Sequence, residues 1–537
     1  MPFERCAANP GWCRSSLRYG RSPSRGRVEP ARRSSLMSNV TSEHADAVVV
    51  GSRIAGAAAA IAMARTGRHV IALDRVRFPS DTLSTHLMFP AHVAELVRLG
   101  ALERVLAHRP PRVRHVMLSH QGVSASDRFL PVEGIDFGVC VPRPELDHAL
   151  VETARAFGAE VREHSSVTDL LWDGDRVAGV RYRDKDSDEV REIRAPVTIG
   201  ADGRRSVVAQ LVGADRPYRG SRNGRGFVFW YMDDPKSDDR KWRETYVQWR
   251  AGGTHGMVFP TPSNRMLVSF MGPADRVALF RRDTQGMWER QLRENRRFAA
   301  RVAGATNITR MRGTDDMVSF FRRSSGPGWA LAGDAGHFKD PVLGQGIRDS
   351  LRHGRLVGEA VVRAGDDGPL AIDEALRAWE KERDDDCLPA YHWGNRETRI
   401  VGDDPLVIEA LRTLAVDDLS EIGNAFSRRR NPEHVFGFRR SAGWLLRALS
   451  RPDADRGALL RRALGELLID VDIRYERLLG HFRDSRPARS ERPGWSWPIR
   501  KSQVALNGQG GAGSTGPAFV GGTMTDGVGN GTQDGSR

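Results

Sequence analysis

The strongest constraint on the fold is a strand–turn–helix–strand pattern that begins near residue 47. Residues 47–50 form a continuous apolar run, as expected for a strand that is buried on both faces of a parallel sheet. A turn over residues 51–56 leads into an alanine-rich helix, and a second apolar strand follows at residues 69–73. Asp74 closes that strand. The pattern predicts a βαβ unit of the dinucleotide-binding type.

Each position of this turn has an expected task. Gly51 permits a tight turn, Gly56 permits close helix–sheet packing, and the free N–H groups of the helix start attract a pyrophosphate. Asp74 is placed to accept hydrogen bonds from a ribose hydroxyl. The usual middle glycine is Arg53 here, and we expect it to contact the phosphate groups of the ligand. The alternative is that its long side chain only reaches solvent.

Composition excludes several classes of protein. The 537 residues suggest three to four structural units, and no apolar run approaches the ~20 residues that a membrane span requires. Four cysteines exclude a disulfide-rich secreted scaffold and show no zinc spacing, so we expect no metal site. The net charge is +14, but no block alternates arginines with stacking aromatics. We therefore expect neither a nucleic-acid partner nor a membrane partner, and we expect a cytoplasmic protein that is a monomer or a homodimer.

The two ends of the chain have a different composition from the rest. Residues 1–44 form a basic extension that is rich in Ser, Pro and Gly and lacks the apolar core of a secretory signal. One hypothesis is that translation starts at Met37, and the alternative is a transit peptide. Residues 501–537 are a low-complexity Gly-rich tail, so disorder is expected there.

Three later stretches resemble further parts of a dinucleotide site. Residues 143–150 open a helix with Pro144 in its first turn. Residues 197–203 read as a short strand that ends in Asp-Gly, and residues 329–337 as another strand that ends in an acid. The run from Pro341 to Gly346 then leads into a long helix.

With these motifs in this order, the sequence resembles the FAD-dependent monooxygenases of the para-hydroxybenzoate hydroxylase fold, a superfamily that includes geranylgeranyl reductases and flavin-dependent halogenases. The resemblance covers about residues 45–365. It implies an α/β fold with a three-layer β-β-α FAD domain, an inserted antiparallel substrate sheet and a C-terminal helical region. It also implies that FAD contacts Gly51, Arg53, Ile54, Ala55, Gly56, Asp74, Arg75, Arg143, Val167, Asp202, Gly203, Gly333, Asp334, Pro341, Gly344 and Gly346. The acid that the family commonly has seven residues after the last glycine is His353 here, which puts that contact in doubt.

The expected domain boundaries follow from the same resemblance. The FAD-binding domain occupies residues 45–215 and is completed by residues 326–365. Residues 216–325 form the substrate sheet, to which residues near 112–140 contribute. Residues 366–500 are mainly helical, for example at 406–414 and 458–477, and they cap the substrate entrance or form an interface.

Substrate-side residues are harder to predict from the sequence. The loop at residues 78–86 runs toward the flavin ring in this fold, so we select Thr82, Thr85 and His86, with His86 able to move a proton near neutral pH. Arg250, Arg310 and Arg312 are candidates for recognising a carboxylate. The alternatives are a loop with satisfied hydrogen bonds and arginines exposed to solvent. His337, which follows the cofactor aspartate, is expected to be structural.

The resemblance implies an activity. We expect an FAD-dependent monooxygenase that uses NAD(P)H and O₂ to oxygenate a small molecule, such as an antibiotic-biosynthetic intermediate, through a flavin C4a-hydroperoxide. One alternative is N-oxygenation of a small acidic amine by the same mechanism, and another is a reductase or dehydrogenase without oxygenation. Halogenation is not expected. The Trp-x-Trp-x-Ile-Pro motif of the halogenases is absent, and residues 1–184 contain no lysine.

Overall fold

The computed structural model describes residues 42–480 except 121, 222–223, 252–253, 399–403, 417–419 and 436. The Met37 hypothesis, most of the basic extension and the Gly-rich tail lie outside these residues. Within them the structure is a mixed α/β fold with a helical C-terminal region, as the sequence predicts. No helix in the described part of the chain is both long enough and apolar enough to span a membrane.

A six-stranded sheet forms the centre of the nucleotide-binding part. Its strand order is β20-β21-β12-β2-β3-β8, and all pairs are parallel except β20 with β21. The apolar runs predicted as strands are fully buried in it. The strands are β2 (Ala47–Val50), β3 (Val70–Leu73), β8 (Glu160–Arg162), β12 (Thr198–Gly200), β20 (Ser325–Gly326) and β21 (Trp329–Leu331).

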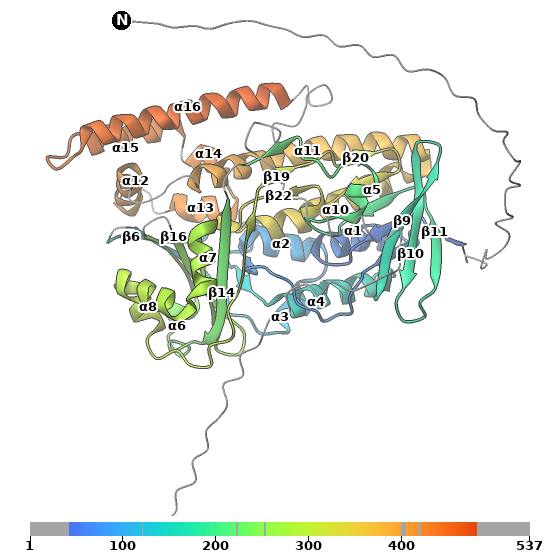
Figure 1. The fold of residues 1–537 in the computed structure, drawn as a ribbon, viewed down its shortest axis with the longest axis horizontal. Coiled ribbons are helices and arrows are strands. Elements are labelled where there is room, and N and C mark those ends of the chain that lie inside the picture. The colour runs from blue at the N-terminus through green and yellow to red at the C-terminus, as the bar shows by residue number, and fades with distance from the viewer. Residues whose placement is uncertain are drawn as a thin grey trace, which may run out of the picture.

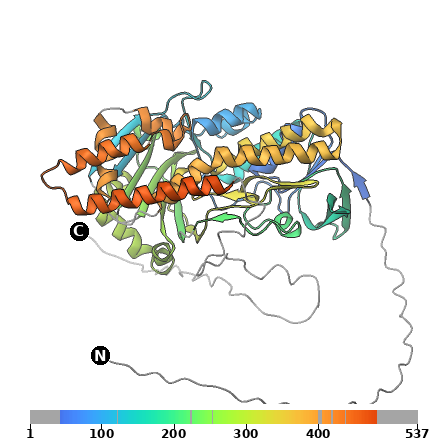
Figure 2. The ribbon, with the colours of Figure 1, turned by 90° about the horizontal axis from the view of Figure 1, so that it is seen from above.

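Helices on one face and a second sheet complete this part of the molecule. Helix α1 (Ile54–Ala64) packs against α4 (Arg143–Ala156) and against α10 (Gly346–Ala364), and α10 lies beside α11 (Pro369–Glu397) in both ribbon views (Figures 1 and 2). A four-stranded sheet in the order β1-β11-β10-β9 forms the third layer. Its strands are β1 (Ser42–His44), β9 (Ser165–Asp173), β10 (Arg176–Asp184) and β11 (Val190–Arg194).

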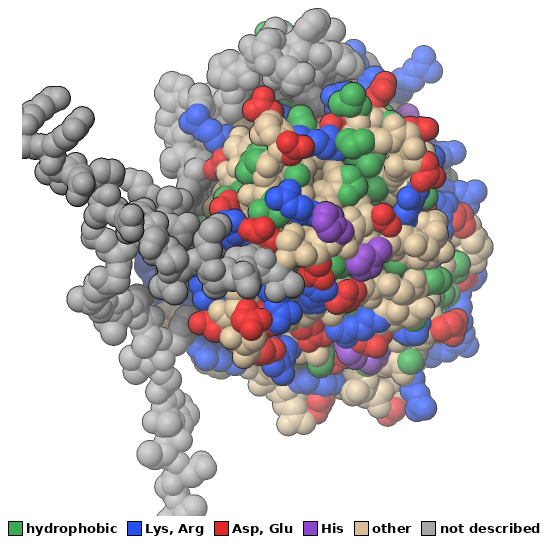
Figure 3. Space-filling view, turned by 90° about the vertical axis from the view of Figure 1, so that its right-hand side faces the viewer, with side chains coloured by type: hydrophobic (Ala, Val, Ile, Leu, Met, Phe, Trp, Pro, Cys, Tyr) green, Lys and Arg blue, Asp and Glu red, His purple; other side chains and the backbone are tan. Residues whose placement is uncertain are grey.

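The surface near β9–β11 mixes the two signs of charge. Figure 3 shows Lys and Arg side chains interspersed with Asp and Glu over this face, with no extended basic stripe in view. The net charge of the chain is therefore not gathered into a basic patch on this side of the molecule.

A seven-stranded sheet stands beside the nucleotide-binding part. Its order is β18-β14-β17-β16-β15-β5-β6. The prediction of an antiparallel sheet needs one correction, because β15 and β5 pair in parallel. The two strands are distant in the chain, so no hairpin joins them and antiparallel pairing is not required. The strands are β5 (His115–His120), β6 (Val123–Arg128), β14 (Arg225–Asp233), β15 (Thr245–Ala251), β16 (Thr254–Thr261), β17 (Arg265–Pro273) and β18 (Arg312–Met317).

The C-terminal helices cover one end of that sheet. Helix α12 contacts β5 and β6, α15 packs on α12, and α16 lies against α15 (Figures 1 and 2). The helices predicted at 406–414 and 458–477 are confirmed as parts of α12 and α16. The helices are α12 (Pro405–Val416), α13 (Ser420–Ser427), α14 (Pro432–Val435), α15 (Phe438–Leu449) and α16 (Arg456–Gly480).

Candidate functional site

The turn between β2 and α1 is held in its nucleotide-binding shape by close backbone contacts. Gly51 has φ +94°, and a Cβ added to Gly56 would lie 1.7 Å from the Gly51 carbonyl oxygen. Asp74 supports the same turn, since its Oδ2 accepts the Ser52 N–H at 2.8 Å and its Oδ1 accepts the Val76 N–H at 3.1 Å. Burial raises the pKa of Asp74. The carboxyl group thus braces the turn, and each oxygen keeps a second lone pair for a hydroxyl.

Arg53 and Arg143 meet on one buried carboxylate. Asp147 is fully buried, accepts from Arg143 Nε at 2.9 Å and is also ion-paired with Arg53. Arg53 further donates to Ser80, from Nη1 to the carbonyl oxygen at 3.1 Å and from Nη2 to Oγ at 2.8 Å. Sequence reasoning missed Asp147, although its spacing of four residues from Arg143 on a helix was a usable signal.

Residues from separate sequence motifs converge at the end of the parallel sheet. A Cβ added to Gly51 would lie 2.6 Å from the Ala201 carbonyl oxygen, next to Asp202, and a Cβ added to Gly333 would meet Ala55 at 2.7 Å. The first turn, the Asp-Gly strand end and the strand end near residue 333 therefore form one constellation, at the carboxyl edge where open parallel sheets bind ligands.

Two carboxyl groups of this constellation have unused hydrogen-bonding capacity. Asp202 Oδ2 accepts the Val207 N–H at 2.6 Å, whereas its buried Oδ1 has no partner in the described structure. No described group donates to the carboxyl oxygens of Asp334, and burial raises the pKa of both acids. Acceptors with free capacity at a nucleotide-binding edge, one buried on Asp202 and the others on the half-buried Asp334, fit the hydroxyl groups of an FAD ribityl or ribose chain.

The predicted flavin-side loop at residues 341–346 is fastened from two sides. His92 of α2 (Pro90–Arg98) accepts the Phe89 N–H at Nδ1 and donates from Nε2 to the Gly344 carbonyl oxygen at 2.9 Å. Asp340 accepts the Val342 N–H at 3.0 Å and is paired with Arg225. Burial lowers the pKa of His92 to about 3, so the ring stays neutral and keeps its donor on the loop.

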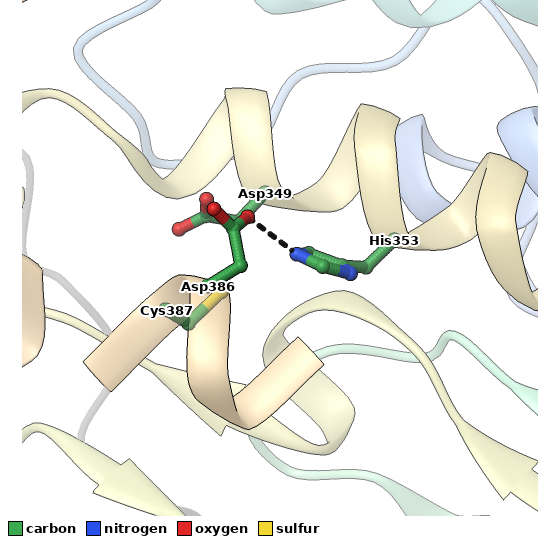
Figure 4. A group of neighbouring side chains, drawn as sticks. All are labelled: Asp349, His353, Asp386 and Cys387. Atoms are coloured by element: carbon green, nitrogen blue, oxygen red, sulfur yellow. Dashed lines mark hydrogen bonds and ion pairs between the residues drawn. The ribbon is translucent and has the colours of Figure 1, made fainter. Parts of the chain in front are cut away.

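A cluster of buried charges lies behind the same loop, between α10 and α11. Asp349, His353, Asp386 and Cys387 stand close together, and His353 Nε2 lies 2.9 Å from Asp386 Oδ2 (Figure 4). Lys339 and Arg348 pair with Asp349, and Arg348 and Arg428 pair with Asp386. These cations occupy the carboxylates that a metal ion would need, so the cluster is an ion-pair network. His353, the departure from the family acid, belongs to this network.

His337 also lies beside this network. It stacks on Phe321, with 5.3 Å between ring centroids, and its Nε2 is 3.9 Å from Asp349. Burial lowers the pKa of His337 to about 3.

Of the substrate-side residues chosen from the sequence, Thr82, Thr85 and His86 lie in the 78–86 loop, and Arg312 is ion-paired with Asp81 of that loop. His86 is buried with φ +59° between Phe229 and Tyr231, and neither ring nitrogen has a hydrogen-bond partner in the described structure. Burial, together with Arg143 and Arg312, holds the pKa of His86 well below its usual value. His86 is therefore neutral near pH 7, and because a neutral imidazole has an acceptor nitrogen, its predicted role in moving a proton stays a prediction.

The arginine candidates interact with other parts of the protein, and the other predicted residues differ in exposure. Arg312 is ion-paired with Asp81 of the loop, which places the guanidinium within 5.7 Å of the Phe229 ring. Arg250 pairs with Glu397, and Arg310 also has an interaction within the protein. Thr82 and Thr85 are half-buried in the loop, Arg75 is exposed, and Val167 lies on β9.

A mainly apolar cavity of about 330 Å³ opens between the seven-stranded sheet and the C-terminal helices. It reaches the flavin-side loop at Val342 and Leu343, and Leu467 of α16, which is 47% exposed, forms part of its outer wall. The volume falls within the ~300–1,000 Å³ of small-molecule sites. Thr82, Thr85, His86, Arg310 and Arg312 do not line it. Its aliphatic and aromatic lining includes Leu343, Val407, Leu411, Ile422, Phe426 and Trp444.

Sequence reasoning missed this cavity because its walls come from segments that are far apart in the chain. The apolar periodicity of residues 405–427 was the available signal, but periodicity does not show which sheet a helix will cover.

The βαβ turn, the converging acidic strand ends and the fastened 341–346 loop together define an FAD-binding protein. A family model described as "FAD binding domain" matches residues 44–366, which is more than half of the chain. The chain belongs to this family and is an FAD-dependent oxidoreductase.

The named proteins to which this chain is similar have several different activities. The chain is 29% identical over 344 residues to the menaquinone reductase of Mycolicibacterium smegmatis, covering 60% of this chain and 77% of that protein. It is 28% identical over 342 residues to digeranylgeranylglycerophospholipid reductase 1 of Methanopyrus kandleri, covering 63% and 86%. PqsL of Pseudomonas aeruginosa, a probable FAD-dependent monooxygenase, superimposes with a TM-score of 0.55 at 19% identity, over 71% of this chain and 99% of that one. The last likeness shows the fold alone.

Proposed function

We propose that this oxidoreductase is a monooxygenase that uses NAD(P)H and O₂ to oxygenate an apolar small molecule held in the cavity. The observation that carries the proposal is the contact between an apolar cavity and the 341–346 loop, which borders the flavin ring in proteins of this fold. FAD, when bound at the residues described above, would supply the redox chemistry between NAD(P)H and O₂. In the net reaction one oxygen atom enters the substrate and the other leaves as water.

The chain's own residues position the reactants and exclude water. The aliphatic side chains of α12 and α13 favour burial of an apolar substrate and keep bulk solvent from the loop. His92 and Asp340 hold the loop, and Asp147 holds the two arginines predicted at the phosphates. The mainly aliphatic lining suits a molecule with a large apolar body better than a small amine, so carbon oxygenation is preferred over N-oxygenation.

A reductase without oxygenation is the second candidate. The names of the two relatives above favour it, because both are reductases. In that case the same cavity would hold a substrate that gains two hydrogen atoms in place of one oxygen atom.

The test separates the two by stoichiometry and product mass. The purified protein should show flavin absorbance, oxidise NADPH or NADH with matching O₂ uptake, and convert a bound apolar substrate to a product labelled from ¹⁸O₂. A product two mass units heavier, formed without O₂, would replace the monooxygenase with the reductase. A protein that neither retains FAD nor can be reconstituted with it would overturn both.

A matched pair of variants tests the cavity itself. Leu411→Trp fills the cavity and should raise KM or abolish turnover while FAD stays bound. Leu446→Trp, at a position that is 68% exposed on the neighbouring α15, should behave as wild type. Equal activity of the two variants would show that the substrate lies elsewhere.

A further inference from the structure

The cavity contains a buried cation whose hydrogen-bonding capacity is only partly used. Arg428 lines the cavity, and its side chain is only 2% exposed. Its Nη2 donates to the Asp386 carbonyl oxygen at 3.0 Å, whereas Nη1 has no partner in the described structure. A buried donor without a partner is destabilising, and more so when it is charged. Arg428 also has φ +60°, an uncommon conformation for a residue other than glycine.

A second buried side chain in the cavity, Gln345, has an acceptor without a partner among the described residues. Gln345 lines the cavity and is 4% exposed. Its Nε2 donates to the Leu343 carbonyl oxygen at 3.1 Å, whereas Oε1 has no partner in the described structure. Gln345 also approaches the Phe426 carbonyl oxygen at 3.4 Å, two residues before Arg428. Arg428 and Gln345 thus both line the cavity, and each has one polar atom without a partner in the described structure.

The charges around Arg428 leave it incompletely neutralised. Asp349 and Asp386 are the carboxylates of its network, and they also serve Lys339 and Arg348. Burial lowers the pKa of His353 to about 4, so His353 brings neither a second cation nor an anion near neutral pH. Burial raises the pKa of the Cys387 thiol to about 12, so it brings no anion.

The other charged groups that line or approach the cavity are paired with one another, and one of them, Glu397, pairs with Arg250. Arg352 of α10 approaches Asp386 but is shared with Glu95 of α2. Farther out, Arg396 pairs with Glu466 and Asp470, and Arg462 pairs with Asp404. The positive charge that remains at the loop end favours an anion.

We propose that Arg428 and Gln345 form a head-group subsite for an amphiphilic acid. Arg428 Nη1 donates to an ionised oxygen of the substrate, and Gln345 Oε1 accepts from a neighbouring hydroxyl or N–H group. The apolar body of the substrate lies along the aliphatic wall toward α16. The inference rests on the proposed function, because it names the class of molecule that the cavity would present to the flavin-side loop.

The experiment measures binding to the full-length, FAD-loaded protein with three probes of equal chain length: 1-decanol, decanoate and 2-hydroxydecanoate. By titration calorimetry near pH 7.5, decanoate should bind at least ten-fold tighter than decanol, and 2-hydroxydecanoate tighter still. Arg428→Met should abolish the preference for the carboxylate while decanol binding persists. Gln345→Met should remove only the gain from the hydroxyl group. Arg447→Met, on the exposed face of α15, is the control and should match wild type.

The outcomes are separable from those of the proposed function. Equal affinity of the wild type for decanol and decanoate, or an unchanged preference in Arg428→Met, would overturn the head-group subsite. If Arg428→Met does not fold, Arg428→Lys keeps the charge but lacks the two planar NH₂ donors of a guanidinium. It should weaken decanoate binding more than decanol binding. O₂ uptake and flavin absorbance are read independently. A protein that oxygenates without preferring acids loses only this inference, and one that prefers acids without consuming O₂ loses only the monooxygenase.

Discussion

At the scale of single residues, the site depends on side chains that hold other side chains. Asp147 is the best example, because it is fully buried and serves both Arg53 and Arg143. A carboxylate shared by two guanidinium groups is costly to lose, since removing one member of a buried ion pair destabilises a protein by about 3–5 kcal/mol. Asp147 therefore links the stability of α4 to the geometry of the predicted phosphate contacts.

Asp147→Asn tests this link. The amide keeps the size of the side chain but removes its charge, so Arg53 and Arg143 lose their common anchor. We expect the melting temperature to fall and FAD affinity to weaken at least ten-fold, as measured by flavin fluorescence titration. Glu152→Gln, on the same helix and paired with the half-buried Arg155, should change neither quantity appreciably. An Asp147→Asn protein that binds FAD as wild type does would show that the two arginines need no anchor.

At the scale of elements, the contact between α1 and α10 is made possible by small residues. A Cβ added to Gly354 would lie 2.4 Å from the Ala55 carbonyl oxygen, and one added to Gly358 would lie 2.7 Å from the Ala59 carbonyl oxygen. Helix α1 carries the nucleotide-binding turn at its start, and α10 begins at the flavin-side loop. The spacing of these two helices thus sets the spacing between the two predicted ends of the cofactor site.

Gly358→Ala should force α1 and α10 apart. Overpacking of a tight contact typically costs about 1–3 kcal/mol, so we expect a lower midpoint of urea unfolding together with weaker FAD binding. Gly443→Ala provides the matched control, because that glycine also lies inside a helix but an added Cβ meets nothing within 4 Å. The control should be neutral or slightly stabilising, since alanine has the higher helix propensity. Equal stability of both variants would contradict the packing argument.

Local sequence predicts well those strands and turns whose characteristic residues all lie within the strand or turn itself. The apolar run at 47–50, the turn that follows it and the strand ends near Asp202 and Asp334 could be recognised because each contains its own strand signal and turn residues. The fold followed from their order along the chain.

Other features depend on tertiary partners and could not be found in this way. The parallel pairing of β15 with β5 joins segments that are more than a hundred residues apart. The cavity requires knowing that α12 packs on β5 and β6, and the anchoring of Gly344 by His92 joins two residues 252 positions apart. Hydrophobic periodicity carries no information about such partners.

At the scale of the whole molecule, stability should depend on keeping several histidines uncharged. Burial lowers the pKa of His92 and His337 to about 3 and that of His353 to about 4. All three lie behind or beside the flavin-side loop. In an unfolded chain a histidine titrates near pH 6.5. The folded and unfolded states therefore bind different numbers of protons over a wide range of pH.

The sign of the effect follows from this difference. Well above pH 6.5 neither state protonates these rings, and their full contribution to stability is present. As the pH falls below 6.5, the unfolded chain takes up protons that the folded protein refuses, so the free energy of unfolding decreases. The loss is about 1.4 kcal/mol per pH unit for each histidine until the folded pKa is reached. The lowered pKa values of Asp349 and Asp386 act in the same direction, but only below about pH 4.

We therefore expect urea unfolding midpoints that are level from pH 8 to 7 and fall steadily from pH 6.5 to 4.5. In His92→Gln the slope of unfolding free energy against pH should decrease by about 1.4 kcal/mol per pH unit in that window, because one proton fewer separates the two states. His69→Gln, which changes a half-exposed histidine on the surface, is the control for the substitution itself. A wild-type curve that stays level down to pH 5 would mean that the folded protein admits these protons. The contact in which His92 Nδ1 accepts the Phe89 N–H would then have to break before the chain unfolds, because a protonated Nδ1 cannot accept, and FAD affinity would fall over the same pH range.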